Sequence, residues 1–162
     1  MTLVYLGLGS NLGDKAAHLR DAFVQLANLG TILKTSRVYE TEPVGDTNQD
    51  WFLNCAVALE TVLEPDKLLA AIKTIERRLG RTRTRRNGPR VIDIDILFYD
   101  DRVVNTSRLV IPHPRLQDRL FVLQPLMDLD PTFVHPVLTK TIQDLYQGRT
   151  WTDKVVPCER PV

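Results

Sequence analysis

The sequence predicts an α+β fold, because three observations agree. Apolar, strand-like segments and segments with helical spacing follow one another in the order βαββαβ. Polar stretches broken by Gly and Pro separate these segments. The 162 residues, 43% apolar and 25% charged, have the size and composition of one globular domain. We therefore expect residues 1–162 to form a single domain.

The first half of the chain contains three predicted strands and one helix. Residues 3–8 form an apolar run that ends in a Gly-Ser-Asn loop, and apolar residues recur at helical spacing over 15–29 before a glycine ends the helix. Residues 31–41 have the pattern of a second strand. A polar loop at 42–50, broken by Pro and Gly, separates them from a third strand-like run at 51–62.

The second half adds a helix and a fourth strand. Pro65 opens a helical segment with an apolar stripe, and Gly80 ends it. The arginine-rich residues 81–90 lead into a strand at 91–99, and Asp100 begins a tight turn. The remaining segments are apolar residues at 103–104 and 109–111, short helices at 121–127 and 141–146, and a tail after residue 151 without a clear pattern.

A helix after the first strand and another after the third define the split βαβ, ferredoxin-like arrangement. Its sheet is antiparallel, and both helices pack on one face. Because this fold carries many unrelated functions, the function has to be argued from the site.

Charge, hydropathy and cysteine content exclude several classes of protein. The 21 Lys and Arg nearly balance the 20 Asp and Glu, which argues against a surface built to bind nucleic acid. No apolar window reaches the roughly 18 residues of a spanning helix, and the first residues lack the basic region of a signal peptide. Two isolated cysteines, Cys55 and Cys158, suggest a reducing compartment. We expect a cytoplasmic monomer without membrane or nucleic-acid partners.

Two carboxylates interrupt the apolar strand at 91–99. Side chains alternate between the faces of a strand, so Asp93 and Asp95 point the same way, roughly 6.6 Å apart, while the neighbouring isoleucines face the other side. A lone Asp-x-Asp is more often a solvated strand face. Asp128 and Asp130 repeat the spacing before a proline turn, and we interpret that second pair as structural. The first pair differs because arginines precede it.

Arginines are concentrated between Arg77 and Arg90, where seven of the 21 basic residues lie. Guanidinium groups make two-pronged contacts with phosphate, and carboxylates hold hard cations, so the combination favours a bound polyphosphate. A solubilising patch and an RNA-binding loop are the alternatives, and the lack of interleaved aromatic residues weakens the second. The sequence has no Gly-x-x-x-x-Gly-Lys-Ser/Thr phosphate loop.

A second candidate site follows the polar loop at 42–50. Phe52 offers a flat ring face, and the Asn54 amide offers a donor and an acceptor to the edge of a heterocycle. Taken alone, a core Phe and a turn Asn are the simpler interpretation. His113, between two prolines, is equally suited to capping local backbone or to contacting a ligand, whereas His135 is interpreted as structural.

Several blocks of sequence, in one order, together resemble a known family. They are Leu6–Gly13, Tyr39–Pro43, Phe52–Asn54, Glu76 with Leu79–Arg81, Arg86–Asp95 and Pro112–Arg115. The combination resembles the 6-hydroxymethyl-7,8-dihydropterin pyrophosphokinases of folate biosynthesis over about residues 3–126. The resemblance implies a ferredoxin-like fold and transfer of pyrophosphate from ATP to the hydroxymethyl group of the pterin, with release of AMP.

The resemblance also implies roles for single residues. Asp93 and Asp95 match carboxylates that hold two Mg²⁺ against the ATP phosphates, and Arg81 and Arg90 match catalytic arginines that grip those phosphates. The residues that match ATP contacts are Glu76, Arg81, Arg83, Arg86, Arg90, Ile96, Arg108, His113 and Arg119. Those that match pterin contacts are Thr41, Val44, Phe52, Asn54 and Phe121, the two phenylalanines stacking on either side of the ring.

The sequence departs from the family pattern mainly in its loops. Family members often carry Tyr at the position of Phe52 and an aromatic residue at that of Asn87. Pro114 follows His113 at a position where other members have a different residue. The arginine loop is also slightly shorter than in some members. These departures bear on loop closure rather than on the central chemistry. The competing hypothesis is a small RNA-binding module on the same fold, although the carboxylate pair would repel a polyanion unless metal is present.

Overall fold

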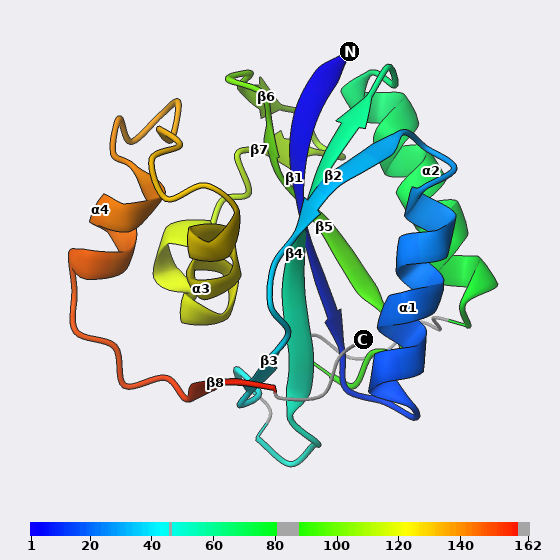
Figure 1. Cartoon of the computed structure of the whole chain (residues 1–162), viewed down its shortest axis with the longest axis vertical. Coiled ribbons are helices and arrows are strands. Elements are labelled where there is room, and N and C mark those ends of the chain that lie inside the picture. The colour runs from blue at the N-terminus through cyan, green and yellow to red at the C-terminus, as the bar shows by residue number, and fades with distance from the viewer. Residues whose placement is uncertain (46, 81–87, 159–162) are drawn as a thin grey trace.

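A computed structural model describes residues 1–45, 47–80 and 88–158 (Figure 1). Its elements are β1 (Thr2–Ser10), α1 (Lys15–Leu26), β2 (Thr31–Thr35), β3 (Tyr39–Thr41), β4 (Phe52–Thr61), α2 (Pro65–Arg78), β5 (Asp93–Tyr99), β6 (Val104–Asn105), β7 (Val110–Ile111), a 3-10 turn (Leu116–Asp118), α3 (Leu120–Leu129), α4 (Ile142–Gln147) and β8 (Val155–Pro157). This order confirms the predicted βαββαβ core.

One predicted strand, at 31–41, is divided into β2 and β3. The Ser36 hydroxyl lies between them and accepts the N–H of Ala56 at 2.8 Å, while the Ser36 N–H donates to the carbonyl of Ala56 at 2.9 Å. A side chain thus replaces a backbone acceptor of the ladder, and the two halves pair separately with β4.

The main sheet has the order β5-β1-β4-β3-β8, and β2 also pairs with β4. Its pairings are antiparallel, as predicted. The two longest strands, β1 and β4, lie at the centre and pair from Thr2 opposite Thr61 to Ser10 opposite Leu53. The first five strands therefore have the strand order of a ferredoxin-like sheet, and β8 adds an edge strand from the tail that had no clear sequence pattern.

Helices cover both faces of this sheet (Figure 1). α1 and α2 pack on one face, where their apolar residues form the larger core with Leu6, Leu8 and Ile96. α3 and α4 lie over the other face, on a second core that includes Phe98 and Leu123. The prediction that the two helices of the βαββαβ core share a face is confirmed. Among the described residues, no helix is long and apolar enough to cross a membrane.

The second Asp-x-Asp pair ties the end of α3 to the sheet. Asp128 accepts the hydroxyl of Tyr39 at 2.7 Å and the N–H of Arg37 at 3.1 Å. Asp130 accepts the hydroxyl of Tyr5 at 2.9 Å. Burial, together with these carboxylates, raises the pKa of both tyrosines. The structural interpretation of this pair is therefore confirmed.

His135 also has a structural position, beside the ring of Phe98. Its Nδ1 accepts the N–H groups of Val137 and Leu138 at 3.1 and 3.0 Å, which requires that nitrogen to be unprotonated. Burial accordingly lowers the pKa of His135. The imidazole is protonated more readily in the unfolded chain, so its contribution to stability is full above the unfolded pKa of about 6.5 and is lost as the pH falls from there through the lower folded pKa.

We expect the free energy of unfolding in urea to become more favourable to the unfolded state between about pH 7.5 and about pH 5.5 in the wild type than in His135→Asn, so that the difference between the two proteins changes over this interval. Asparagine keeps an acceptor near the position of Nδ1 but does not titrate there. Burial and the charge of Arg119 lower the pKa of His113 to about 4, and burial with neighbouring carboxylates raises the pKa of Asp95 to about 7. These two contributions have opposite signs and are common to both proteins. An equal change of the unfolding free energy in the two proteins would show that His135 does not contribute to the pH dependence.

Candidate active site

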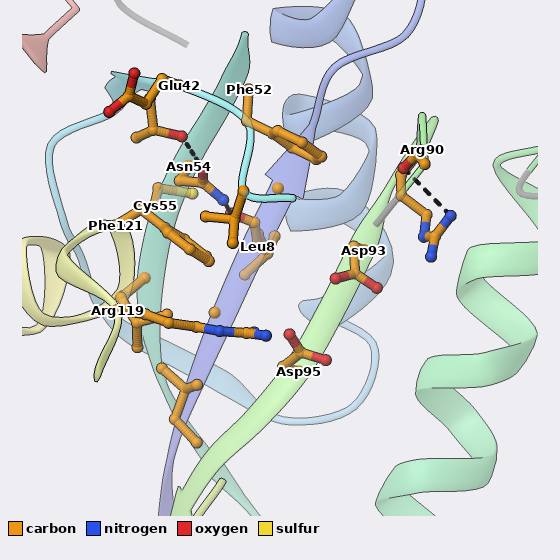
Figure 2. Close-up of a pocket in the computed structure, with 18 residues that line it drawn as sticks. Leu8, Glu42, Phe52, Asn54, Cys55, Arg90, Asp93, Asp95, Arg119 and Phe121 are labelled. Carbon is orange, nitrogen blue, oxygen red and sulfur yellow. Dashed lines mark hydrogen bonds between the residues drawn. The ribbon is translucent and has the colours of Figure 1, made fainter. Parts of the chain in front are cut away.

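A pocket opens on the sheet face that also carries α3 (Figure 2). Its walls come from β1, β3, β4 and β5, from the segments that follow β3 and precede β5, and from the start of α3. The predicted site residues that line it are Thr41, Val44, Phe52, Asn54, Arg90, Asp93, Asp95, Arg119 and Phe121. The fold thus brings the two candidate sites of the sequence together in one cavity.

Asp93 and Asp95 stand at the start of β5 and point into this pocket (Figure 2). In the register of β5 and β1, Asp93 lies opposite Gly9 and Asp95 opposite Gly7. These partners have no side chains of their own, and both carboxylates line the cavity. Desolvation in the pocket, with the charges of Asp93 and Glu76, raises the pKa of Asp95 to about 7. A bound cation would relieve this accumulation of negative charge.

Glu76 fixes the start of β5 from the side of α2. Its buried carboxylate accepts the N–H of Ile94 at 2.9 Å and lies 3.5 Å from the ammonium group of Lys73. Ile94 is the residue between the two aspartates, and its N–H lies on the edge of the sheet. The bond to Glu76 therefore satisfies an edge donor and holds both aspartates in place.

Two basic side chains border the carboxylates. Arg119, just before α3, extends across the pocket toward Asp95 (Figure 2). Its positive charge lowers the pKa of the Asp95 carboxyl, but by less than desolvation and the neighbouring carboxylates raise it. Arg119 also lies 5.6 Å from the ring centroid of Phe121. Arg90 lines the opposite side, and its Nη1 donates to the carbonyl of Gly88 at 3.3 Å. Guanidinium groups therefore approach the carboxylate pair from two directions.

The other end of the pocket is aromatic and neutral. Phe52 and Phe121 lie on two sides of the Asn54 amide (Figure 2). The amide is held firmly, because its Oδ1 accepts the hydroxyl of Thr41 at 2.6 Å and its Nδ2 donates to the carbonyl of Leu8 at 3.2 Å. Ring faces and an oriented amide suit a flat heterocycle with polar edges.

Asn11 joins three segments that surround the pocket. Its Nδ2 donates to Oε1 of Gln49 at 2.8 Å and to the carbonyl of Asp50 at 3.0 Å. Its Oδ1 accepts the N–H of Arg90 at 2.8 Å, and its own N–H donates to the carbonyl of Arg90 at 3.0 Å. Asn11 itself is buried, at 1% exposure. The end of β1 therefore links the loop before β4 to the segment before β5.

The structure places the other predicted ATP contacts outside the lining of this pocket. Ile96 belongs to the core beneath α1 and α2, and Arg108 is exposed between β6 and β7. His113 donates its N–H to the carbonyl of Leu97 at 3.0 Å, and its Nδ1 accepts the N–H of Arg115 at 3.3 Å, so it does cap local backbone. Arg81, Arg83 and Arg86 lie outside the described residues.

Sequence reasoning did not assign pocket roles to Gly7, Gly9, Asn11 and Glu42. The two glycines alternate along β1, and this spacing on a strand was a signal that other groups approach one of its faces closely. The contacts of Asn11 and Glu42 are made with distant segments, which no local pattern indicates.

Fold and pocket define a class: α+β proteins with a small-molecule site in which acidic and basic groups adjoin aromatic rings. Comparison with known proteins makes this specific, since the family model of the 7,8-dihydro-6-hydroxymethylpterin-pyrophosphokinases matches residues 5–131. The chain belongs to this family, which confirms the resemblance seen in the sequence.

Two relatives that are named as pyrophosphokinases of this kind align with most of the chain. A 2-amino-4-hydroxy-6-hydroxymethyldihydropteridine pyrophosphokinase of Methylorubrum extorquens is 53% identical over 136 residues, 83% of this chain and 86% of the relative. One from Bacillus subtilis is 42% identical over 154 residues, covering 94% and 92%. A folic acid synthesis protein of Dictyostelium discoideum is 48% identical over 136 residues, but these are only 21% of that longer protein.

Solved structures share the fold. A Plasmodium falciparum HPPK-DHPS structure with pterin and p-hydroxybenzoate superposes with a TM-score of 0.73 at 22% identity, over 91% of this chain and 41% of that chain. The chain thus spans less than half of this HPPK-DHPS protein. At this identity, the similarity supports the ferredoxin-like fold and carries no residue roles.

Proposed function

We propose that this pocket transfers a pyrophosphoryl group from ATP to the hydroxymethyl group of 6-hydroxymethyl-7,8-dihydropterin, a step of folate biosynthesis that releases AMP. Family membership supports the reaction. The observation that carries the assignment to this pocket is that the carboxylate pair on β5 and the aromatic amide site on β4 line one cavity. A phosphate chain and a pterin ring would then lie next to each other.

Asp93 and Asp95 are the residues that would hold Mg²⁺. Among the described residues, no group of three or more His, Cys, Asp or Glu is arranged to hold a metal alone. A pair of carboxylates nevertheless fits Mg²⁺, which is commonly bound by one or two carboxylates together with substrate phosphates and water. The raised pKa of Asp95 also supports a site that accepts positive charge. When bound, the metal would neutralise the triphosphate and make its phosphorus atoms more open to attack.

Arg90 and Arg119 supply fixed positive charge around the phosphates. Arg90 is positioned by its backbone bonds to Asn11, and Arg119 by its place before α3. Both would stabilise charge that develops on the phosphate oxygens and on the departing AMP. Arg81, Arg83 and Arg86 are proposed to join them, and Glu76, Ile96, Arg108 and His113 to surround the nucleotide, as the family resemblance implies.

The pterin is proposed to lie between Phe52 and Phe121, with its edge on Asn54 and on the segment from Thr41 to Val44. Stacking excludes water from the ring, and the amide fixes its orientation. Because the acceptor hydroxymethyl group would then face the carboxylate end, the chain can work by positioning and charge stabilisation, without a covalent intermediate.

A direct assay tests the proposed function. The protein is incubated with ATP, Mg²⁺ and 6-hydroxymethyl-7,8-dihydropterin, and AMP and the pterin diphosphate are measured by chromatography. Equimolar formation of the two products is expected. Absence of AMP, together with RNA binding that weakens with salt and ignores Mg²⁺, would favour the RNA-binding module instead.

Gly9→Ala is expected to weaken pterin binding selectively. An added Cβ would lie 2.5 Å from Nδ2 of Asn54, so the amide must move and lose its bonds to Thr41 and Leu8. We expect the KM for the pterin to rise by about tenfold, which corresponds to the free energy of about one or two hydrogen bonds.

Gly7→Ala is the matched control on the same strand face. Its Cβ would meet the end of the Leu97 side chain at 3.3 Å, and this flexible group can shift. Steady-state kinetics should therefore show a much smaller rise in the KM for the pterin. Equal effects of the two substitutions would argue against the role given to Asn54.

The remaining sequence expectations stand as part of the proposal. Residues 1–162 are proposed to form one pyrophosphokinase domain, which the family match over 5–131 and the shared sheet of the two cores support. We also propose that the domain acts as a cytoplasmic monomer on small-molecule substrates alone.

A further inference from the structure

Glu42 lines the pocket, yet its carboxylate is directed away from Asp93 and Asp95 (Figure 2). Its Oε1 accepts the N–H of Lys154 at 3.0 Å, and its own N–H donates to the carbonyl of Lys154 at 3.2 Å. An acidic residue of the pocket wall is thus joined by two bonds to the segment just before β8.

The position of these bonds explains the side chain's orientation. β3 and β8 are antiparallel, with Thr41 opposite Val155, so Glu42 and Lys154 form the next pair of the ladder. In a regular hydrogen-bonded pair the N–H of Lys154 would donate to the carbonyl of Glu42. Here it donates to the Glu42 carboxylate. The side chain therefore takes the place of the carbonyl, and the backbone is released to turn into the pocket wall through Pro43.

Residues on both sides of Glu42 in the chain belong to the end of the pocket proposed to bind the pterin. Thr41 precedes Glu42 and donates its hydroxyl to the Asn54 amide. Val44, two residues after Glu42, lines the cavity. The C-terminal strand is itself anchored at its other end, because the N–H of Cys158 donates to the carbonyl of Val38 at 2.8 Å. The tail therefore lies along the whole segment that leads into the pterin wall.

We propose that Glu42 is a positioning residue for the pterin, acting through the C-terminal segment: its carboxylate holds Lys154 and so fixes the wall between Thr41 and Val44. This inference rests on the proposed function. The same bond keeps a further negative charge out of a cavity that already contains the carboxylate pair. The tail after residue 151 thereby supports the substrate site from outside, since none of its described residues, 152–158, lines the pocket.

Glu42→Ala tests the proposal in the full-length protein. We expect the KM for the pterin to rise by about fivefold, the loss that corresponds to one hydrogen bond, with kcat and the KM for ATP within about twofold of the wild type. Glu42→Gln keeps an acceptor oxygen at the same place and is expected to restore the wild-type KM. A purely structural role would change both KM values and kcat together.

Lys154 offers a matched pair of variants for the other side of the bond. Lys154→Pro removes the N–H and should reproduce the effect of Glu42→Ala, while the double variant should be no worse than either single one. Lys154→Ala removes an exposed side chain but keeps the N–H, and should leave the kinetics unchanged.

Several results would overturn the proposal. They are an unchanged pterin KM in Glu42→Ala, an equal rise in the KM for ATP, no recovery in Glu42→Gln, or an equal effect of Lys154→Ala and Lys154→Pro. If Glu42→Ala does not fold, the two Lys154 variants decide. A wild type that forms no AMP would instead refute the proposed function, and the pterin dissociation constants of the same proteins, measured by calorimetry, would still decide the role of Glu42.

Discussion

Asp95→Asn is expected to lower turnover by roughly a thousandfold while the protein stays folded. The substitution removes one of the two carboxylates proposed to hold Mg²⁺, at nearly constant volume. Stability should not fall, because desolvation and the charges of Asp93 and Glu76 already oppose the ionised form of Asp95. We therefore expect a thermal unfolding midpoint equal to or above that of the wild type, measured at neutral pH beside the AMP assay.

Asp130→Asn provides the internal control for this loss. Asp130 has the same Asp-x-Asp spacing but accepts the Tyr5 hydroxyl at the far end of α3. Its substitution is expected to lower the unfolding midpoint by a few degrees, since a charged hydrogen bond becomes a neutral one, with turnover unchanged. If Asp95→Asn kept wild-type turnover, Asp95 would have to be removed from the site.

Removal of divalent metal is expected to reduce AMP formation to background. ATP phosphates would otherwise approach Asp93 and Asp95 with no cation between them, and the repulsion between like charges is strong beside a desolvated carboxylate such as Asp95. Excess chelator should stop the reaction, and added Mg²⁺ should restore it fully. Far-ultraviolet circular dichroism should not change, because the fold rests on two cores of buried apolar side chains.

Asp95→Asn serves again as the comparison in this experiment. Its residual activity should respond weakly to Mg²⁺ concentrations that saturate the wild type, because one proposed ligand is missing. Undiminished turnover of the wild type in excess chelator would contradict the metal role of both aspartates.

Much of the fold could be predicted because it follows from local periodicity. The apolar stripe that contains Leu68, Ile72 and Ile75 forms the buried face of α2, and the βαββαβ order then implies the sheet. The division at Ser36 could not be predicted, since a side-chain hydroxyl interrupts the ladder without changing the strand-like pattern. β8 could not be predicted either: it has three residues, and its pairing is determined by β3, more than a hundred residues earlier.

The candidate site, like the fold, could be predicted from the sequence only in part. Strand alternation was enough to place Asp93 and Asp95 on one face, and to separate them from their isoleucine neighbours. The identity of the facing residues was not available, because only the register of β1 against β5 shows that glycines lie opposite the carboxylates. Glu76 shows the limit of residue matching: its carboxylate is engaged by the N–H of Ile94, a role that no motif could reveal.

The two faces of the sheet differ in the amino-acid substitutions that they can tolerate. Apart from Glu76, α1 and α2 contribute apolar packing on the face away from the pocket, and a residue such as Val24 on α1 is 65% exposed. Stabilising substitutions on these helices should shift the working temperature of the enzyme with little effect on its chemistry. The pocket face carries glycines, paired charges and loops instead. Natural variation can therefore change thermal adaptation on one side of the molecule and substrate handling on the other, with little conflict between them.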